Sequence, residues 1–387
     1  MDSAEREGLR PKGNVPNLRF PEFQEEWEES TIGEEFDLYS GNTPSRLNKE
    51  HFNGAINWIS SGELKGHYIA DTKEKISDEA AKTLKMLPIG TFVIAIYGLE
   101  ADGVRGTGSI TKTEATISQA CMAFISKGKV QNEFLYSWYK KHGNVIGIRY
   151  AQGTKQQNLS YDIIEKFKIA YPTFQEQEKL NKFIALLDER IATQNKIIED
   201  LKKLKSAISE NLFKVVNGDV VILSEICEII KGKQVNGEFL SEKGKYYVMN
   251  GGTEPSGYYS DYNVEANTIS ISEGGNSCGY VQFNTSPFWS GGHCYTIQKI
   301  ADNVDHLYLY HYLKSKEDAI MKLRIGSGLP NIQKKDLAIF KIKIPTAKQQ
   351  KVISTFLSSL ERKAEIEEIL LNAMKKEKQY LLRQMFI

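Results

Sequence analysis

Apolar residues recur at alternating spacings of four and three along two long stretches of the chain. The first stretch runs from Leu180 to Leu212 and the second from Ile353 to Met385, and eight of the ten stripe positions are apolar in each. This spacing is typical of a coiled-coil seam, so it predicts two long helices, the first about 40 residues and roughly 60 Å long. We expect the two helices to pack against each other as an antiparallel coiled coil. The seam residues singled out are Leu180, Ile184, Leu187, Ile191, Ile198, Leu201, Leu357, Leu360, Leu371, Met374 and Leu381.

Polar residues interrupt both stripes at equivalent places. Gln194 in the first stripe matches Glu367 in the second, and Lys205 matches Lys378. Polar residues inside a seam often fix the register of the two helices. The alternative interpretation is that these parts of the seam are partly solvated.

The chain contains an internal repeat. Residues 153–213 coincide with residues 326–386 at a shift of 173 without a gap, and the identities include Gln177 with Gln350 and Phe213 with Phe386. The beginnings of the halves match at a shift of 191, so the second half is shorter by 18 residues. Each half is therefore a diverged globular segment followed by a better-kept long helix.

The globular segments, 30–171 and 220–344, predict mixed and mostly β structure. Short β-rich runs alternate with turns rich in glycine, asparagine and serine, such as those over 103–109 and 273–279. The predicted strands lie within 91–97, 268–272 and 293–299, and one helix is expected in each segment, over 133–142 and 306–314.

The predicted fold class is α+β, with two mostly β domains joined by the two long helices in a pseudo-two-fold repeat. The sequence 217–219, Asn-Gly-Asp, ends the first long helix and starts the second half. The expected divisions are a loosely attached lead-in (1–20), a first domain (21–172), a central helix (173–217), a second domain (218–345) and a C-terminal helix (346–387).

Composition indicates an ordinary packed protein of the cytoplasm. Apolar residues make up 41% and charged residues 26% of the 387 residues, and no apolar run reaches the ~18 residues of a membrane span. The first residues are polar, so no secretion signal is expected. With a formal charge of +1 the chain is not basic overall, although nucleic-acid binding needs only one basic face.

The motifs of catalysis and of metal binding are missing from the sequence. No phosphate-binding loop or dinucleotide-binding turn occurs, and we interpret the glycine-rich residues 103–108 as a tight β-turn. The six histidines are scattered, and no Cys-x-x-Cys pair occurs. We therefore expect no catalytic residues, no metal site and buried, reduced thiols at Cys121, Cys227, Cys278 and Cys294.

The polar turns carry residue types that read DNA grooves. Asn, Gln, Arg, Glu and Ser discriminate base edges, whereas Lys contacts phosphates. The alternative is that these turns are ordinary polar surface. The candidates in the first half are Ser60, Ser61, Glu63, Lys65, Tyr97, Glu100, Arg105, Thr107, Ser118, Gln119, Lys155 and Gln156. Those in the second half are Asn250, Thr253, Tyr258, Ser272, Glu273, Asn276, Ser290, His293, Ser327 and Asn331.

Three local signatures, together with the repeat, resemble the specificity subunit of type I restriction–modification systems. One is Pro-Asn-Leu-Arg-Phe-Pro-Glu-Phe over 16–23, with Glu-Trp-Glu over 26–28, leading into Ile-Gly-Glu over 32–34. Another is Gly-Ser-Gly-Leu-Pro-Asn-Ile over 326–332. The third is the Pro-Thr opening of both helices at 172–177 and 345–350. Residues 153–158 lack the Gly-Ser-Gly and the proline of their counterpart, which leaves the first loop's geometry open.

The resemblance implies two target-recognition domains, each reading one half of a split double-stranded DNA site. It implies that the long helices act as a spacer and that their seams dock two methyltransferase subunits, with which motor–nuclease subunits assemble. Such a subunit has no catalysis of its own. S-adenosylmethionine, ATP and Mg²⁺ would be bound by the partner subunits, and no membrane partner is implied.

Two other functions remain open at the level of sequence. The first is a protein-assembly scaffold whose β-rich domains bind something other than DNA, which a DNA-shift assay would separate. The second is a fused restriction enzyme, which requires nuclease and methyltransferase motifs that the sequence does not contain.

Overall fold

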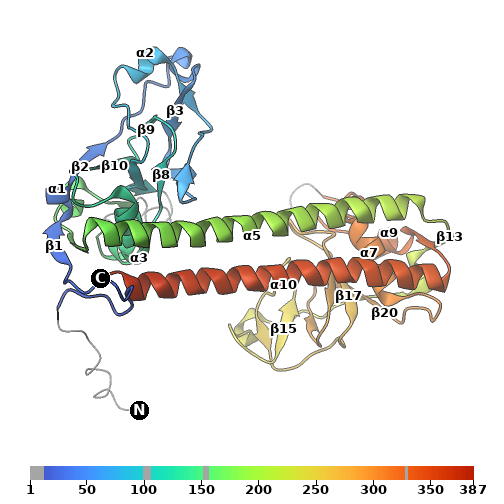
Figure 1. Ribbon diagram of the computed structural model, residues 1–387. Helices are drawn as coiled ribbons and strands as arrows, with labels where there is room; N and C mark the ends of the chain where they lie inside the picture. The colour runs from blue at the N-terminus through green and yellow to red at the C-terminus, as the bar shows by residue number, and fades with distance from the viewer. Residues whose placement is uncertain (1–12, 99–105, 151–156, 327–329) are drawn as a thin grey trace. The chain divides into compact units, whose positions relative to one another are not determined.

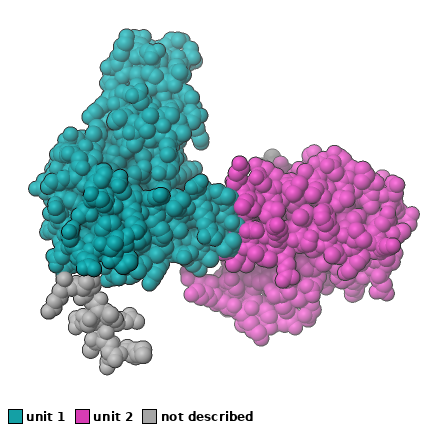
Figure 2. Space-filling view, in the orientation of Figure 1, with its two compact units in different colours: residues 1–195, 370–387 teal, residues 196–369 magenta. Residues whose placement is uncertain are grey.

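The computed structural model describes residues 13–98, 106–150, 157–326 and 330–387. The chain forms two compact units, coloured separately in Figure 2. Unit 1 comprises residues 1–195 and 370–387, and unit 2 comprises residues 196–369. Each unit therefore contains one globular domain and one half of each long helix.

The two long helices are α5 (Phe174–Val215) and α10 (Ala347–Met385), which lie side by side in Figure 1. In unit 2, Lys202 pairs with Glu368 at 2.5 Å and Lys205 pairs with Glu361 at 2.6 Å, so the helices run in opposite directions. In unit 1 the first turns of α5 share a hydrophobic core with the last turns of α10. These contacts confirm the predicted antiparallel pair.

The predicted seam faces the interior of this helix pair. Leu180, Ile184, Ile198, Leu357 and Leu371 are buried, and the other six predicted seam residues are half-buried. Most of the apolar seam is therefore buried by packing of the two helices against each other within the chain. Burial of these apolar side chains supplies the driving force for pairing the two helices.

The lysines that interrupt the seam make register contacts. Lys205 pairs with Glu361 in unit 2, and Lys378 pairs with Asp188 in unit 1. The two lysine side chains are only 21% and 13% exposed. Because Asp188 and Glu361 occupy equivalent positions of the repeat, the same cross-helix ion pair is built twice. Both lysines therefore make the cross-helix contact that the register interpretation requires, while each ion pair stays partly exposed.

The domain of unit 1 is built on a five-stranded sheet of order β2-β10-β6-β8-β4. A three-stranded sheet, β5-β3-β9, and two strand pairs, β1-β12 and β7-β11, complete it. The strands are β1 (Glu28–Thr31), β2 (Phe36–Ser40), β3 (Ile56–Ile59), β4 (Tyr68–Ile69), β5 (Lys75–Ile76), β6 (Phe92–Ala95), β7 (Tyr97–Gly98), β8 (Gly108–Thr111), β9 (Ala115–Ile117), β10 (Cys121–Ser126), β11 (Gln157–Asn158) and β12 (Lys168–Tyr171). The helices are α1 (Ile32–Glu35), α2 (Asp78–Ala81), α3 (Asn132–Tyr150) and α4 (Tyr161–Ile164), with short 3₁₀ turns at Lys49–Phe52 and Ser61–Glu63.

The domain of unit 2 repeats this plan with a four-stranded sheet, β14-β20-β17-β18, and a smaller sheet, β16-β15-β19. The strands are β13 (Asp219–Ile222), β14 (Glu228–Lys231), β15 (Tyr246–Met249), β16 (Tyr258–Tyr259), β17 (Thr268–Ser272), β18 (Val281–Asn284), β19 (Trp289–Ser290), β20 (Cys294–Gln298) and β21 (Lys341–Ile344). The helices are α6 (Leu223–Ile226), α7 (His306–Ser315), α8 (Glu317–Met321) and α9 (Lys334–Ala338), with a 3₁₀ turn at Gly237–Phe239. In both domains the first strand pairs antiparallel with the last, as β1-β12 and β13-β21.

A buried glutamine opens each long helix in the same way. The Gln177 amide nitrogen donates to the carbonyl oxygens of Lys129 and Pro172, and its oxygen accepts from the Gln131 backbone nitrogen. Gln350 makes the matching three bonds to Asn303, Pro345 and Asp305. The identity of these two glutamines in the repeat is thus explained by a shared hydrogen-bonded joint between helix and domain.

Several local predictions need correction. Helix α3 continues eight residues beyond His142 to Tyr150, and β8 already begins at Gly108, inside the segment 103–109 that was predicted as a turn. Residues 103–105 of that segment lie outside the described residues. The strand predicted over 268–272 is β17, and the helix predicted over 306–314 is α7.

The described part of the lead-in is not loosely attached. Arg19 forms a two-pronged ion pair with Glu176 at 2.8 and 2.6 Å, and its side chain is only 11% exposed. The Leu18 backbone nitrogen donates to the Gln384 carbonyl, and the Phe20 ring packs edge-on against Phe183. The polar composition of the lead-in concealed this attachment, because a charged arginine is the residue that anchors it.

Candidate nucleic-acid interface

The same set of backbone hydrogen bonds, which we call the frame, brings polar loops together in both units. In unit 1, the Ile96 nitrogen donates to the Ala120 oxygen at 2.9 Å, and the Leu159 nitrogen donates to the Ile96 oxygen at 2.8 Å. In unit 2, Glu273 stands in the place of Ile96 and bonds in the same way to His293 and Ile332, at 2.9 and 2.8 Å. Each frame therefore brings together loops that are distant in sequence.

A glycine closes each frame by allowing two backbones to meet. A Cβ atom on Gly41 would lie 2.2 Å from the Ile117 oxygen, and one on Gly232 would lie 2.3 Å from the Gly291 oxygen. Neither approach is possible for a residue with a side chain. The two glycines match in the repeat, so the frame explains why both halves contain one.

In unit 2 the frame assembles what we call the second loop cluster, residues 250–253, 272–276, 290–293 and 330–331. The Asn250 side-chain oxygen accepts from the His293 backbone nitrogen at 3.1 Å, and Asn331 forms a β-bridge with Gly274. Among the predicted residues, Thr253, Asn276, His293 and Asn331 are exposed here. These side chains are free to meet a ligand.

The remaining predicted residues of unit 2 are placed differently. Ser272 and Ser290 are buried, and the Ser272 hydroxyl donates to the Gly251 oxygen, so these serines stabilise the frame. Tyr258 pairs with Tyr247 in β16, at the end of β15 opposite to Asn250, and does not join the cluster. Ser327 lies outside the described residues.

In unit 1 the corresponding first loop cluster is residues 60–65, 97, 107 and 118–120. The Ser118 nitrogen donates to the Ile59 oxygen and the Ala95 nitrogen to the Thr107 oxygen, while Tyr97 pairs with Asn158. Lys65 and Gln119 are exposed, Ser61, Tyr97 and Thr107 are half-buried, and Ser118 is buried. Glu100, Arg105, Lys155 and Gln156 lie outside the described residues.

Glu63 has an internal role beside the base-reading role predicted for it. One carboxylate oxygen accepts from the Ser60 backbone nitrogen at 3.0 Å and from the Ser60 hydroxyl at 2.6 Å. The other oxygen accepts from the Lys73 nitrogen at 2.7 Å. One oxygen thus caps the turn at Ser60 and the other holds the Lys73 segment against it, so Glu63 shapes the loop.

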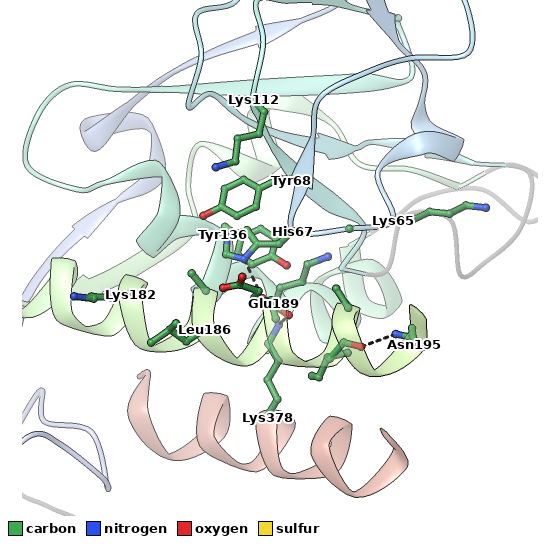
Figure 3. A pocket seen from close by; sticks show the side chains of 16 residues that line it. Lys65, His67, Tyr68, Lys112, Tyr136, Lys182, Leu186, Glu189, Asn195 and Lys378 are labelled. Carbon is green, nitrogen blue, oxygen red and sulfur yellow. Dashed lines mark hydrogen bonds and ion pairs between the residues drawn. The ribbon is translucent and has the colours of Figure 1, made fainter. Parts of the chain in front are cut away.

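A cationic groove lies beside the first loop cluster, between β4 and the face of α5 (Figure 3). Its volume is about 880 Å³, and its lining includes Tyr68, Tyr136 and two carboxylates, Asp188 and Glu189. Five lysines outnumber the carboxylates. They are Lys65, Lys112, Lys140, Lys182 and Lys378. Lysines placed along a groove are suited to contact the phosphates of a nucleic acid.

The floor of this groove is fixed by His67. Its ring is stacked between Tyr68 and Tyr136, with both ring centroids 4.1 Å away. One ring nitrogen lies 2.9 Å from Glu133 and the other 3.0 Å from Asp188. Burial opposes a charge on the ring, but the two carboxylates outweigh it and raise the pKa of His67. His67 therefore holds the β4 edge of the domain onto α3 and α5.

A lysine beside His67 loses its proton at a lower pH than an ordinary lysine does. Burial, assisted by the charge of Lys378, lowers the pKa of Lys140 to about 8. Lys140 donates to the Gly106 oxygen at 2.8 Å and lies 5.2 Å from the Tyr136 ring centre. Sequence reasoning selected only Lys65 among the groove lysines, because the others lie directly after β8 and on α3, α5 and α10 and share no local pattern. The one available signal was Lys378, which interrupts the apolar seam.

The described residues supply no metal centre and no membrane span. Among them no group of three or more histidine, cysteine or acidic side chains is placed to hold a metal ion. Within the same ranges no helix has both the length and the apolar character to cross a membrane. The four cysteines are buried, as expected, and burial raises the pKa of Cys121 and of Cys227 to about 12.

Two β-rich domains with matching frames and different loops, mounted on a shared helix pair, define a paired recognition module. The family of the type I restriction modification DNA specificity domain matches residues 24–203 and again residues 216–376. The chain belongs to this family.

Individual relatives carry the same description. A putative type I specificity subunit of Mycoplasma pneumoniae is 33% identical over 145 residues, which cover 37% of this chain and 38% of that protein. The specificity subunit of the Escherichia coli restriction enzyme EcoR124I/EcoR124II is 30% identical over 192 residues, covering 48% and 46%. The chain thus spans less than half the length of these relatives. The crystal structure of a type I S subunit from M. genitalium has a similar fold, with a TM-score of 0.66 and 19% identity over 96% of this chain and 99% of that one.

Proposed function

We propose that this chain is the DNA-recognition subunit of a type I restriction–modification complex, in which each domain reads one half of a bipartite double-stranded site. The observation that carries the proposal is the pair of frames. One backbone arrangement presents two different sets of polar loops, as expected where two readers share a scaffold but recognise different sequences. Membership of the DNA specificity family and the names of the relatives support it.

The cationic groove of unit 1 contacts the DNA backbone in this proposal, and the loop clusters contact base edges. Lysine–phosphate contacts give affinity and salt dependence without selecting a sequence, whereas contacts from Gln119, Asn276 or Asn331 discriminate bases. The near-neutral charge of the whole chain is no obstacle, because phosphate contacts need only a local excess of cations, which the five groove lysines supply.

Partner subunits dock on the outer face of the helix pair in this proposal. The seam selected from sequence is turned inward, so it supports docking by keeping the helices together. In unit 2 apolar side chains remain exposed on both helices: Ile197 (41%) and Leu204 (51%) on α5, and Phe356 (45%) and Ile366 (54%) on α10. Exposed apolar residues on a helix pair suit a helical partner surface. The two methyltransferase subunits are the partners proposed, with motor–nuclease subunits joining them.

The chain itself performs no catalysis in this account. S-adenosylmethionine, ATP and Mg²⁺ are bound by the partner subunits. The competing assembly-scaffold function predicts a chain that forms complexes but has no sequence preference for DNA, which makes the two proposals separable.

The test is DNA binding by the chain assembled with its methyltransferase partner. We expect the complex to bind one bipartite duplex far more tightly than unrelated duplexes. The double variant Lys112→Ala/Lys182→Ala should weaken binding to all duplexes alike and make its salt dependence less steep, because two phosphate contacts are lost. The exposed pair Lys243 and Lys363, outside the groove, provides the matched control. Equal binding of all duplexes by the wild-type complex would refute the proposal.

A further inference from the structure

A cluster of ionisable side chains lies at the frame of unit 2. The equivalent positions in unit 1 carry apolar or neutral residues. In unit 2 the cluster consists of Lys231, Glu273, His293 and Tyr295. Strand pairing identifies their counterparts, because Lys231 pairs with Tyr295 as Ser40 pairs with Met122, and the Ser272–Cys294 pair matches Ala95–Cys121. The counterparts in unit 1 are therefore Ser40, Ile96, Ala120 and Met122.

The scaffold therefore does not require the charged cluster. Ile96 is 7% exposed and Glu273 is also 7% exposed, and both make the same two backbone hydrogen bonds. A buried carboxylate is costly where an isoleucine suffices. Its presence in one reader only points to a role that differs between the readers.

One oxygen of the Glu273 carboxylate is fully engaged, and the other is turned toward His293. Oε1 accepts from the Tyr295 hydroxyl at 3.0 Å and from the Lys231 ammonium at 2.5 Å. Burial and the Glu273 charge both raise the pKa of Tyr295, so its hydroxyl stays a donor. Oε2 has no hydrogen-bond partner among the described residues, and His293 Nδ1 lies 3.6 Å from it.

His293 is held by its backbone but presents its ring to solvent. Its backbone nitrogen donates to Asn250 and its oxygen accepts from Glu273, while the side chain is 64% exposed. Gly251 (φ +86°) lies so close that a Cβ atom there would be 3.1 Å from the His293 Cβ. Nδ1 faces the Glu273 carboxylate, so Nε2 is the ring nitrogen that is left for a ligand.

We propose that His293 is a specificity-determining residue of the second reader, whose Nε2 contacts a hydrogen-bond acceptor of the DNA, and that Glu273 is its positioning residue. This inference rests on the proposed function. The acceptor is a purine N7 or guanine O6 in the major groove, to which an Nε2–H group donates.

The experiment compares the methylated motif and the DNA affinity of complexes containing the wild-type chain, His293→Ala and His293→Asn. Because the ring is exposed, these variants retain the fold. If Nε2 contacts a base, His293→Ala relaxes one position of one half-site, with a loss of about 5- to 150-fold in preference there, and leaves the other half-site unchanged. If it contacts a phosphate, the motif is kept but binding to all duplexes weakens. The first result supports the proposal, whereas the second overturns it, because a phosphate contact selects no sequence.

A double-mutant cycle tests the positioning role of Glu273. Glu273→Gln should reduce the same preference or affinity as His293→Ala, and the double variant should be no worse than His293→Ala alone, because Glu273 acts through the ring. Additive losses would mean that Glu273 is only structural. The exposed Glu242→Gln variant removes the same charge from unit 2 outside the cluster and serves as the control.

An unchanged motif in both His293 variants overturns the inference, whether or not the affinity changes. This outcome is distinguishable from failure of the proposed function, in which the wild-type complex itself selects no bipartite sequence.

Discussion

Acidification should selectively destabilise unit 2 through His311. This residue lies on α7, is 2% exposed, and its Nε2 is 2.9 Å from the Ser358 hydroxyl on α10. Burial lowers the pKa of His311 to about 4, against about 6.5 for an unfolded histidine. The unfolded chain therefore binds a proton that the folded chain excludes between these values, so stability is present above pH 6.5 and is lost as the pH falls.

The magnitude follows from the two pKa values. At pH 5 the unfolded histidine is almost fully protonated and the folded one is almost fully neutral, so folding loses about 2 kcal/mol relative to pH 7.5. The local consequence is a weaker attachment of α7 to α10, which anchors the second domain to the helix pair. A change of about 2 kcal/mol corresponds to a roughly 30-fold change in an opening equilibrium.

The assay is hydrogen exchange by mass spectrometry on the full chain, corrected for intrinsic exchange rates, on peptides from β17 and β20. Protection in the wild type should fall about 30-fold between pH 7.5 and pH 5, and His311→Gln should abolish most of that fall. His306→Gln, an exposed position on the same helix, should leave the fall in place. If His311→Gln and the wild type lose protection equally, the inferred neutral histidine is wrong.

Two further predictions follow from the contacts of the helix pair. The pH dependence of stability expected from His67 is opposite to that from His311. The pKa of His67 is raised, so its stabilisation of unit 1 is fully present below pH 6.5 and is lost as the pH rises through the folded value. His67→Gln should reduce that loss, measured as hydrogen exchange of the β4 and β8 peptides. The double variant Ile197→Asp/Phe356→Asp should prevent co-purification with the methyltransferase partner while unit 2 keeps its exchange protection. The control Lys196→Asp, on the same helix as Ile197, should have little effect. Unimpaired co-purification of the double variant would exclude this face as the docking surface.

The long-range plan of the molecule could be predicted from sequence because it rests on periodic signals. The apolar stripe ending at Leu212 and its repeat ending at Met385 encode helix length and pairing in every turn. The matched interruptions at Lys205 and Lys378 even pointed to the cross-helix ion pairs. Such signals survive because many residues repeat the same information.

Features that depend on single side chains from distant segments could not be predicted in this way. His67 becomes the floor of a groove only because Glu133 and Asp188, on different helices, approach both ring nitrogens. Glu63 has the residue type of a base-reading residue, but within the fold one of its oxygens bonds to Ser60 and the other to Lys73. Residue type indicates what a side chain is able to bind, whereas its partners in the fold decide what it does bind.

The frame equivalence shows a further limit of sequence comparison. At the constant shift of 173, Glu273 aligns with Glu100. Strand pairing instead shows that the residue equivalent to Glu273 in the first domain is Ile96. The 18-residue difference between the halves is distributed over the diverged loops, so a gap-free comparison fails there. Only the hydrogen-bonded register identifies which residues of the two domains correspond.

The most direct test of the central claim is to exchange residues 30–171 for the same segment of a family relative with a different DNA site, and to sequence the methylated motif in cells that contain the methyltransferase partner. Two independent readers on one frame predict that one half-site changes to that of the donor and the other is retained. A simultaneous change of both half-sites, or retention of both by an active complex, would contradict the account.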